Sequence, residues 1–178
     1  MQKMHFIDDA ERFAYKAWQT LKLSPPVDIS LVVSRLGIDI YYEEFVPEID
    51  GIYLRMPDAP PVIAVNNSYL KPPGRQRFTA AHEIGHHLLA QRIPRSTRLF
   101  FFDCISTNKT LMERASDKFA ALLLMPEDLI RKWFDELSAN PENRIAIIAE
   151  RFQVSPSAVR VRLKELDLPY QMYHYRRR

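Results

Sequence analysis

With 178 residues, of which 47% are hydrophobic and 26% charged, the chain has the size and balance of one globular domain with room for a small appendage. No apolar run is long enough to cross a membrane, residues 1–9 lack a signal-peptide core, and the single cysteine excludes an intrachain disulfide, so we expect a cytoplasmic protein. The net charge of +3 is uneven, because 8 basic and 3 acidic residues from Arg144 onward give +5 and the preceding part gives −2.

Two helices are predicted before residue 38. Residues 8–22 carry apolar side chains at helical spacing, and Pro25-Pro26 ends this pattern. Asp28 can cap a second, shorter helix, and Gly37 suits the position after its last turn. We interpret the apolar stripes of both helices as parts of the core.

Three short segments, 38–43, 51–55 and 62–65, have the composition of strands and are separated by turns that contain proline and aspartate. They predict a small, mostly antiparallel three-stranded sheet packed against helices. Segment 51–55 is our candidate for an edge strand to which an extended peptide could add. An ordinary paired strand is at least as strong an interpretation of it. Pro72-Pro73-Gly74 then predicts a turn before the next helix.

Residues 79–89, TAAHEIGHHLL, hold the pattern H-E-x-x-H. Positions four apart share one face of a helix, so His82 and His86 can offer two imidazole nitrogens to one metal ion. Glu83 lies beside this pair, where it can accept a proton from metal-activated water. The neighbouring apolar residues predict a buried helix, in which such polar groups are costly unless they are bound. We therefore favour a metal site over a chance occurrence of the pattern.

A catalytic zinc usually has three protein ligands. The extended pattern with Gly at 89 and His at 92 is excluded, because the chain has Leu89 and Arg92. Glu113, on a helix predicted for 111–124, is the candidate third ligand, and a solvated glutamate is the alternative. Asp117, one turn further, can accept a hydrogen bond from a ligand histidine. Two histidines and a carboxylate also tolerate manganese or iron in place of Zn²⁺.

Between residues 94 and 110 the pattern is irregular, with an apolar cluster at Leu99–Phe102. This cluster is either a mobile flap over a substrate cleft or a strand folded back on the core, and we favour the second. A further helix opens at Glu127-Asp128 and is predicted to stop near Asn140-Pro141. We place a domain boundary there, between residues 1–138 and 139–178.

Residues 145–163 predict a helix-turn-helix-like segment, in which Ser155 caps the second helix and Pro156 takes its first position. Bound to DNA, that helix would present Ser157, Arg160, Arg162 and Lys164. Gln153 occupies the turn where glycine is common, and only one such unit is present. We therefore favour a scaffold or protein-binding role over nucleic-acid binding, and a solvated end for Arg176–Arg178.

The stretch Arg75–Leu89, together with Glu113–Asp117 and Phe119–Pro126, resembles the ImmA/IrrE family of metallo-endopeptidases. The likeness extends upstream to Leu36–Ile38, Gly51–Tyr53 and Val62–Asn66 and downstream to Ala149–Ser155, and so covers most of residues 25–168. It implies an α+β fold with a zincin-like helical core, followed by the helix-turn-helix-like segment.

The resemblance also implies a gluzincin-type site, with His82, His86 and Glu113 as zinc ligands and Glu83 as the catalytic base. Asp117 stands where the family often has Asn or Asp. Family members are typically cytoplasmic regulators that cut a helix-turn-helix repressor and so relieve repression of mobile-element or stress-response genes. Their turnover is expected to be slow or triggered.

Two hypotheses follow. The first is a zinc endopeptidase that acts on a repressor protein; the second is a DNA-binding regulator whose metal site is structural or vestigial. Glu83 lies beside two histidines and a further carboxylate, which leave the fourth coordination position of a metal ion open for water. This arrangement favours the endopeptidase hypothesis over a structural metal site. His87 is a weak candidate for stabilising the oxyanion, and a core or surface role is favoured for it.

Overall fold

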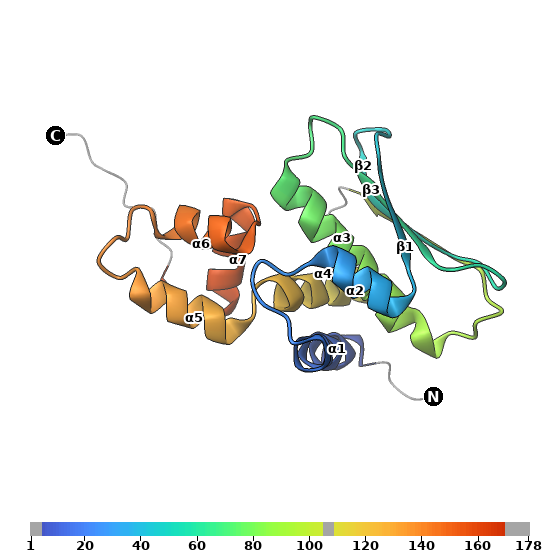
Figure 1. The fold of residues 1–178 in the computed structure, drawn as a ribbon, viewed down its shortest axis with the longest axis horizontal. Helices are drawn as coiled ribbons and strands as arrows, with labels where there is room; N and C mark the ends of the chain where they lie inside the picture. Colours follow the sequence, from blue (N-terminus) through green and yellow to red (C-terminus); the bar gives the residue numbers. More distant parts are fainter. Residues whose placement is uncertain (1–4, 105–108, 170–178) are drawn as a thin grey trace.

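The computed structural model describes residues 5–104 and 109–169, which form an α+β fold of helices and one small sheet (Figure 1). Helix α1 (Phe6–Leu21) and helix α2 (Ile29–Leu36) confirm the two predicted N-terminal helices. The Asp28 side chain accepts a hydrogen bond from Leu31 N, and Gly37 ends α2 with a φ of 67°. Both predicted ends of α2 are therefore set by local chemistry.

The sheet has four strands: β1 (Asp39–Glu43), β2 (Ile49–Arg55), β3 (Val62–Asn66) and β4 (Leu99–Cys104), in the order β1-β3-β2-β4. β1 pairs with β3 in parallel, whereas β2 pairs antiparallel with both β3 and β4. The mostly antiparallel arrangement is confirmed, but the predicted count of three strands was wrong. The fourth strand contains the apolar cluster Leu99–Phe102, whose unbroken run of large side chains hides the alternation of a strand.

Segment 51–55 is not an edge, so the edge interpretation was wrong and the alternative of an ordinary paired strand is confirmed. It lies in β2, where Tyr53 is opposite Ile63 of β3 on one side and Phe101 of β4 on the other. The edge position next to β2 belongs to β4, which arrives from far along the chain. The order of strands along the sequence therefore differs from their order in space.

Helix α3 (Pro73–Leu89) packs on one face of the sheet, and helix α4 (Leu111–Leu124) packs against α3 and α1 on the side away from the strands. A short 3₁₀ turn (Ala90–Arg92) follows α3 (Figure 1). α3 begins inside the predicted turn at Pro72-Pro73-Gly74, because proline is well suited to the first position of a helix. α4 has the predicted bounds, and Thr110 caps it by accepting a hydrogen bond from Glu113 N. The core between helices and sheet includes the fully buried side chains of Tyr53, Ile63, Ile84, Phe119 and Leu123.

The chain ends in α5 (Glu127–Glu136), α6 (Arg144–Phe152) and α7 (Pro156–Glu165). α5 stops earlier than predicted, and the predicted Ser155 cap of α7 is confirmed by a hydrogen bond from Ala158 N. These helices share one hydrophobic cluster with the rest of the molecule, through Met125, Ile130, Ile148, Phe152, Val159 and Leu163. The boundary near residue 138 stays a prediction.

The three arginines at positions 176–178 lie outside the described residues. Within the described ranges, no helix combines the length and the apolar character that crossing a membrane requires.

Candidate metal centre

The polar face of α3 is enclosed by the fold. His82, Glu83 and His86 are each 0% exposed. One helical turn separates the two imidazoles, and their Nε2 atoms lie 3.0 Å apart. The centre of the candidate site is therefore this buried pair of Nε2 atoms from His82 and His86.

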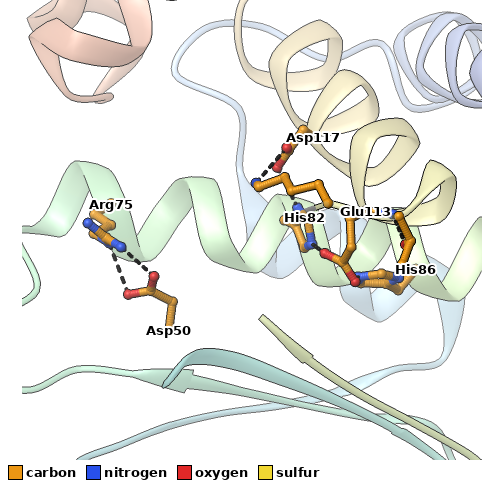
Figure 2. A network of polar contacts seen from close by, with 8 residues as sticks. Asp50, Arg75, His82, His86, Glu113 and Asp117 are labelled. Atoms are coloured by element: carbon orange, nitrogen blue, oxygen red, sulfur yellow. Dashed lines mark hydrogen bonds and ion pairs between the residues drawn. The ribbon is translucent and has the colours of Figure 1, made fainter. Parts of the chain in front are cut away.

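α4 brings Glu113 to the same point (Figure 2). Its Oε2 lies 3.1 Å from His82 Nε2, and its Oε1 lies 3.3 Å from His86 Nε2. The candidate ligand atoms of these three residues lie within 4.8 Å of one another. The structure thus brings together the three residues that the sequence suggested as ligands.

Asp117 lies behind His82, away from the point where the three side chains meet. His82 Nδ1 donates a hydrogen bond of 2.9 Å to Asp117 Oδ1, and Lys109 Nζ donates one of 2.6 Å to Asp117 Oδ2. The expected partner of a ligand histidine is therefore in place. Lys109 was not anticipated, because a lysine in an irregular segment gives no sequence signal for such a role.

The protonation of His82 tests whether these residues suit a cation. Burial alone would lower the pKa of His82, but hydrogen bonds to Asp117 and Glu113 outweigh it and raise the pKa to about 10. His82 then donates from both ring nitrogens, and its Nε2 proton lies among the Glu113 carboxylate and His86 Nε2. Two imidazole nitrogens and a carboxylate that converge on one buried point are a donor set that suits zinc. The residues present therefore fit a divalent ion.

Glu83 is buried beside this cluster, and both of its carboxylate oxygens are without a hydrogen-bond partner among the described residues. Burial raises its pKa well above the ordinary value. Gly51 of β2 makes room for it, because a Cβ at that position would lie 2.6 Å from Glu83 Oε1. A buried carboxyl group without a partner is costly, so a functional role accounts for it better than a structural one.

Asp103 also lies in this cluster, although no sequence pattern indicated it. Candidate ligand atoms of His82, Glu83 and Asp103 also lie within 4.8 Å of one another. Asp103 lies two residues after Phe101 on β4, and residues two apart on a strand face the same side of the sheet. A prediction of this strand would therefore have placed Asp103 on the same face as Phe101. Burial raises the pKa of Asp103, and His82 and Lys109 oppose that effect.

His87 is held elsewhere. Its Nδ1 lies 3.0 Å from Tyr53 Oη on β2, and burial, with the charges of Arg55 and Arg95, lowers the pKa of His87 to about 4. His87 is thus a partly buried, neutral imidazole that contacts the sheet, which agrees with the core or surface role favoured for it from the sequence.

A cleft of about 710 Å³ lies between the neighbourhood of Asp103 and Asp117 and helix α7, and its lining does not include His82, Glu83, His86 or Glu113. Asp103, Asp117 and Thr79 line it on the side of the metal centre, and Ser157, Val161 and Glu165 line it on the side of α7. The second helix of the helix-turn-helix-like segment is thus a wall of the cleft.

Arg162 departs from its predicted place on a DNA-facing surface. It is 1% exposed, its Nε donates to Met125 O at 3.1 Å, and its Nη1 donates to Glu165 at 2.9 Å. Arg162 lies with Val159, Leu163 and Leu166 on the buried stripe of α7, at spacings of three and four that the sequence already contained. The suggested nucleic-acid contacts are therefore reduced to Ser157, Arg160 and Lys164.

Comparison with known proteins agrees with this geometry. No curated protein matches the chain. The family model Peptidase_M78, described as IrrE N-terminal-like domain, matches residues 33–164, from α2 to the last turn of α7. Because that match covers most of the sequence, the chain belongs to the IrrE N-terminal-like peptidase family, which supports a metallopeptidase-type function.

Proposed function

We propose that the protein is a zinc-dependent endopeptidase in which His82, His86 and Glu113 hold the ion. The observation that carries this proposal is the buried carboxyl group of Glu83, which has no hydrogen-bond partner among the described residues and lies next to three converging candidate ligands. When bound, zinc would supply Lewis-acid activation of water and of the scissile carbonyl. Manganese is the alternative ion for the same donor set.

Glu83 then has the role of general base. Its buried carboxyl group has no other partner in the described structure, so it is available to take a proton from the attacking water. A pKa raised by burial also suits the return of that proton to the leaving amine. His82 is oriented meanwhile by Asp117, and Asp117 by Lys109.

The substrate is proposed to bind as an extended strand along β4. β4 is an edge of the sheet, and Asp103 of this strand is near His82 and Glu83. Main-chain hydrogen bonds at such an edge would position a peptide whatever its sequence. The neighbouring cleft, bounded by α7, would accept side chains on one side of the cut bond.

The proposed protein substrate is a helix-turn-helix repressor in the cytoplasm, whose cleavage would relieve repression. This part rests on the family alone. The proteins to test first are small repressors encoded beside the gene, incubated with the zinc-loaded protein and analysed by mass spectrometry for a single cut.

Replacement of Glu83 tests the mechanism. Glu83→Gln keeps the shape of the side chain but removes its basicity, so cleavage of the repressor should fall by a factor of about 10²–10⁴. Zinc content, measured by elemental analysis, should stay at the wild-type level. Glu43→Gln, at an exposed position on β1, is the control and should cleave normally. Cleavage by Glu83→Gln at the wild-type rate would exclude the mechanism.

The second candidate function is a DNA-binding regulator, favoured by the basic C-terminal end and the helix-turn-helix-like form of α6 and α7. Its predicted signature is sequence-selective binding at nanomolar concentrations that weakens steeply with salt. The burial of Arg162 counts against it.

A further inference from the structure

The two histidines of the centre are held in different ways. His82 Nδ1 has Asp117 as its hydrogen-bond partner. His86 Nδ1 is buried and has no partner among the described residues. A ligand histidine normally has its second nitrogen fixed by a hydrogen bond, which sets the direction of the ring. Another contact must therefore orient the His86 ring.

Phe101 of β4 provides that contact. Its ring lies 4.7 Å from the His86 ring between centroids, with only 11° between the planes, so the two rings are stacked. The His82 ring also meets the His86 ring in an edge-to-face arrangement, with 73° between the planes. The fully buried imidazole is thus confined by one face-to-face and one edge-to-face neighbour.

The position of Phe101 is in turn fixed by its neighbours on the sheet. It lies opposite Tyr53 on β2, and these two rings are stacked with 6.0 Å between centroids and 19° between planes. Tyr53 Oη lies 3.0 Å from His87 Nδ1, one residue beyond His86 on α3. A closed set of contacts therefore connects α3, β2 and β4 around the ring of His86.

We propose that Phe101 is the positioning residue of His86 and replaces, by stacking, the hydrogen bond that His82 receives from Asp117. The inference rests on the proposed metal site. The orientation of the His86 ring, and so the direction in which its Nε2 points, then depends on the pairing of β4 with β2. The strand along which a substrate would bind is then also the strand that orients a ligand.

The test is the affinity of purified full-length protein for zinc alone, measured by competition with a chromophoric chelator. Phe101→Leu keeps an apolar side chain but removes the flat ring, and it should weaken zinc binding about tenfold. Phe101→Tyr keeps the ring and should bind zinc as the wild type does. Phe100→Leu, on the same strand at a 54% exposed position, is the matched control and should have no effect.

A second readout is the visible spectrum of the cobalt-substituted protein, which reports the geometry of the ligands. Phe101→Leu should change the band positions, whereas Phe100→Leu should not. Thermal unfolding of the metal-free variants shows whether each one is folded. If Phe101→Leu fails to fold, NMR of the metal-free wild type decides the question, since a stacked Phe101 must shift the His86 ring protons upfield.

The outcomes separate the two proposals. Wild-type affinity and an unchanged cobalt spectrum in Phe101→Leu, or His86 ring protons without an upfield shift, would overturn the role of Phe101 and leave the peptidase proposal intact. A wild-type protein that binds neither zinc nor cobalt would overturn both.

Discussion

In the metal-free protein, His82 donates one ring N–H group to Asp117 and the other to Glu113. Zinc would take the place of the proton on Nε2. Burial alone would raise the pKa of Glu113, but the hydrogen bonds and charges of His82 and His86 outweigh it and lower the pKa, whereas burial lowers the pKa of His86. Neither group therefore has a proton to lose at neutral pH. Binding of the proposed zinc would therefore be a competition between the ion and a proton for Nε2 of His82.

This competition predicts the pH dependence of metal affinity. Because the pKa of His82 in the metal-free protein is about 10, the ring is protonated at pH 6–8 and must release one proton to bind zinc. The apparent affinity should therefore rise about tenfold for each unit of increasing pH. Calorimetry in buffers with different ionisation enthalpies measures the released proton directly. An affinity that is constant between pH 6 and 8 would contradict this view of the site.

At the scale of secondary-structure elements, the position of Glu83 depends on how β2 is fastened to α3. Asp50, next to Gly51 on β2, forms ion pairs with Lys71 Nζ at 2.7 Å and with Arg75 in the first turn of α3 (Figure 2). The side chains of Asp50 and Lys71 are each only 7% exposed. Loss of one partner would leave a buried charge without compensation.

Asp50→Asn should therefore lower the free energy of unfolding by about 3 kcal/mol at pH 7. Burial alone would raise the pKa of Asp50, but the hydrogen bonds and charges of Arg75 and Lys71 outweigh it and lower the pKa. The contribution of the Asp50 carboxylate to the free energy of unfolding is thus present above the pKa of aspartate in the unfolded chain, which is about 4. This contribution is lost as the pH falls through the pKa of Asp50 in the folded protein. Urea unfolding of both proteins at pH 7 and at pH 3 measures the free energy of unfolding under each condition.

The difference in free energy of unfolding between the wild type and Asp50→Asn should accordingly become smaller as the pH is lowered from 7 to 3. Asp58→Asn, in an exposed turn, is the control and should change stability little at either pH. Equal stability of Asp50→Asn and the wild type at pH 7 would show that the ion pairs do not fasten β2 to α3.

At the scale of the whole molecule, the C-terminal helices are attached to the peptidase core by a close approach of two backbones. A Cβ on Gly74, in the first turn of α3, would lie 2.7 Å from Ser155 N and 2.7 Å from Val154 C. These atoms belong to the turn between α6 and α7, and α7 is a wall of the cleft. Residues on both sides of this contact, Pro72 and Arg75 beside Gly74 and Ser155 before α7, line the cleft.

Gly74→Ala should separate the two segments. Alanine gains up to about 1 kcal/mol in helix propensity, but forcing backbone apart costs about 1–3 kcal/mol, so a net loss of stability is expected. Hydrogen exchange should increase in α6 and α7 more than in α4. Pro73→Ala, at an exposed neighbouring position, is the control for changes in the first turn of α3. Unchanged protection of α6 and α7 would show that the contact is not needed.

The sequence by itself determined the features that depend on neighbours within one or two helical turns. The spacing of His82 and His86, the Asp28 and Ser155 caps and the bounds of α4 all follow from the local geometry of a helix. The buried position of Arg162 was also encoded, in its place between Val159 and Leu166 on the apolar stripe of α7, but its charge concealed it.

Only the tertiary structure decided what lies around these local features. The pairing of β4 with β2 made β2 a central strand, brought Asp103 beside Glu83 and stacked Phe101 on His86. Lys109, the residue before the Thr110 cap of α4, donates a hydrogen bond to Asp117, a contact that no short sequence pattern indicates. Contacts between residues far apart in the chain depend on the packing of the whole core, whereas a helical motif carries its geometry in its own spacing.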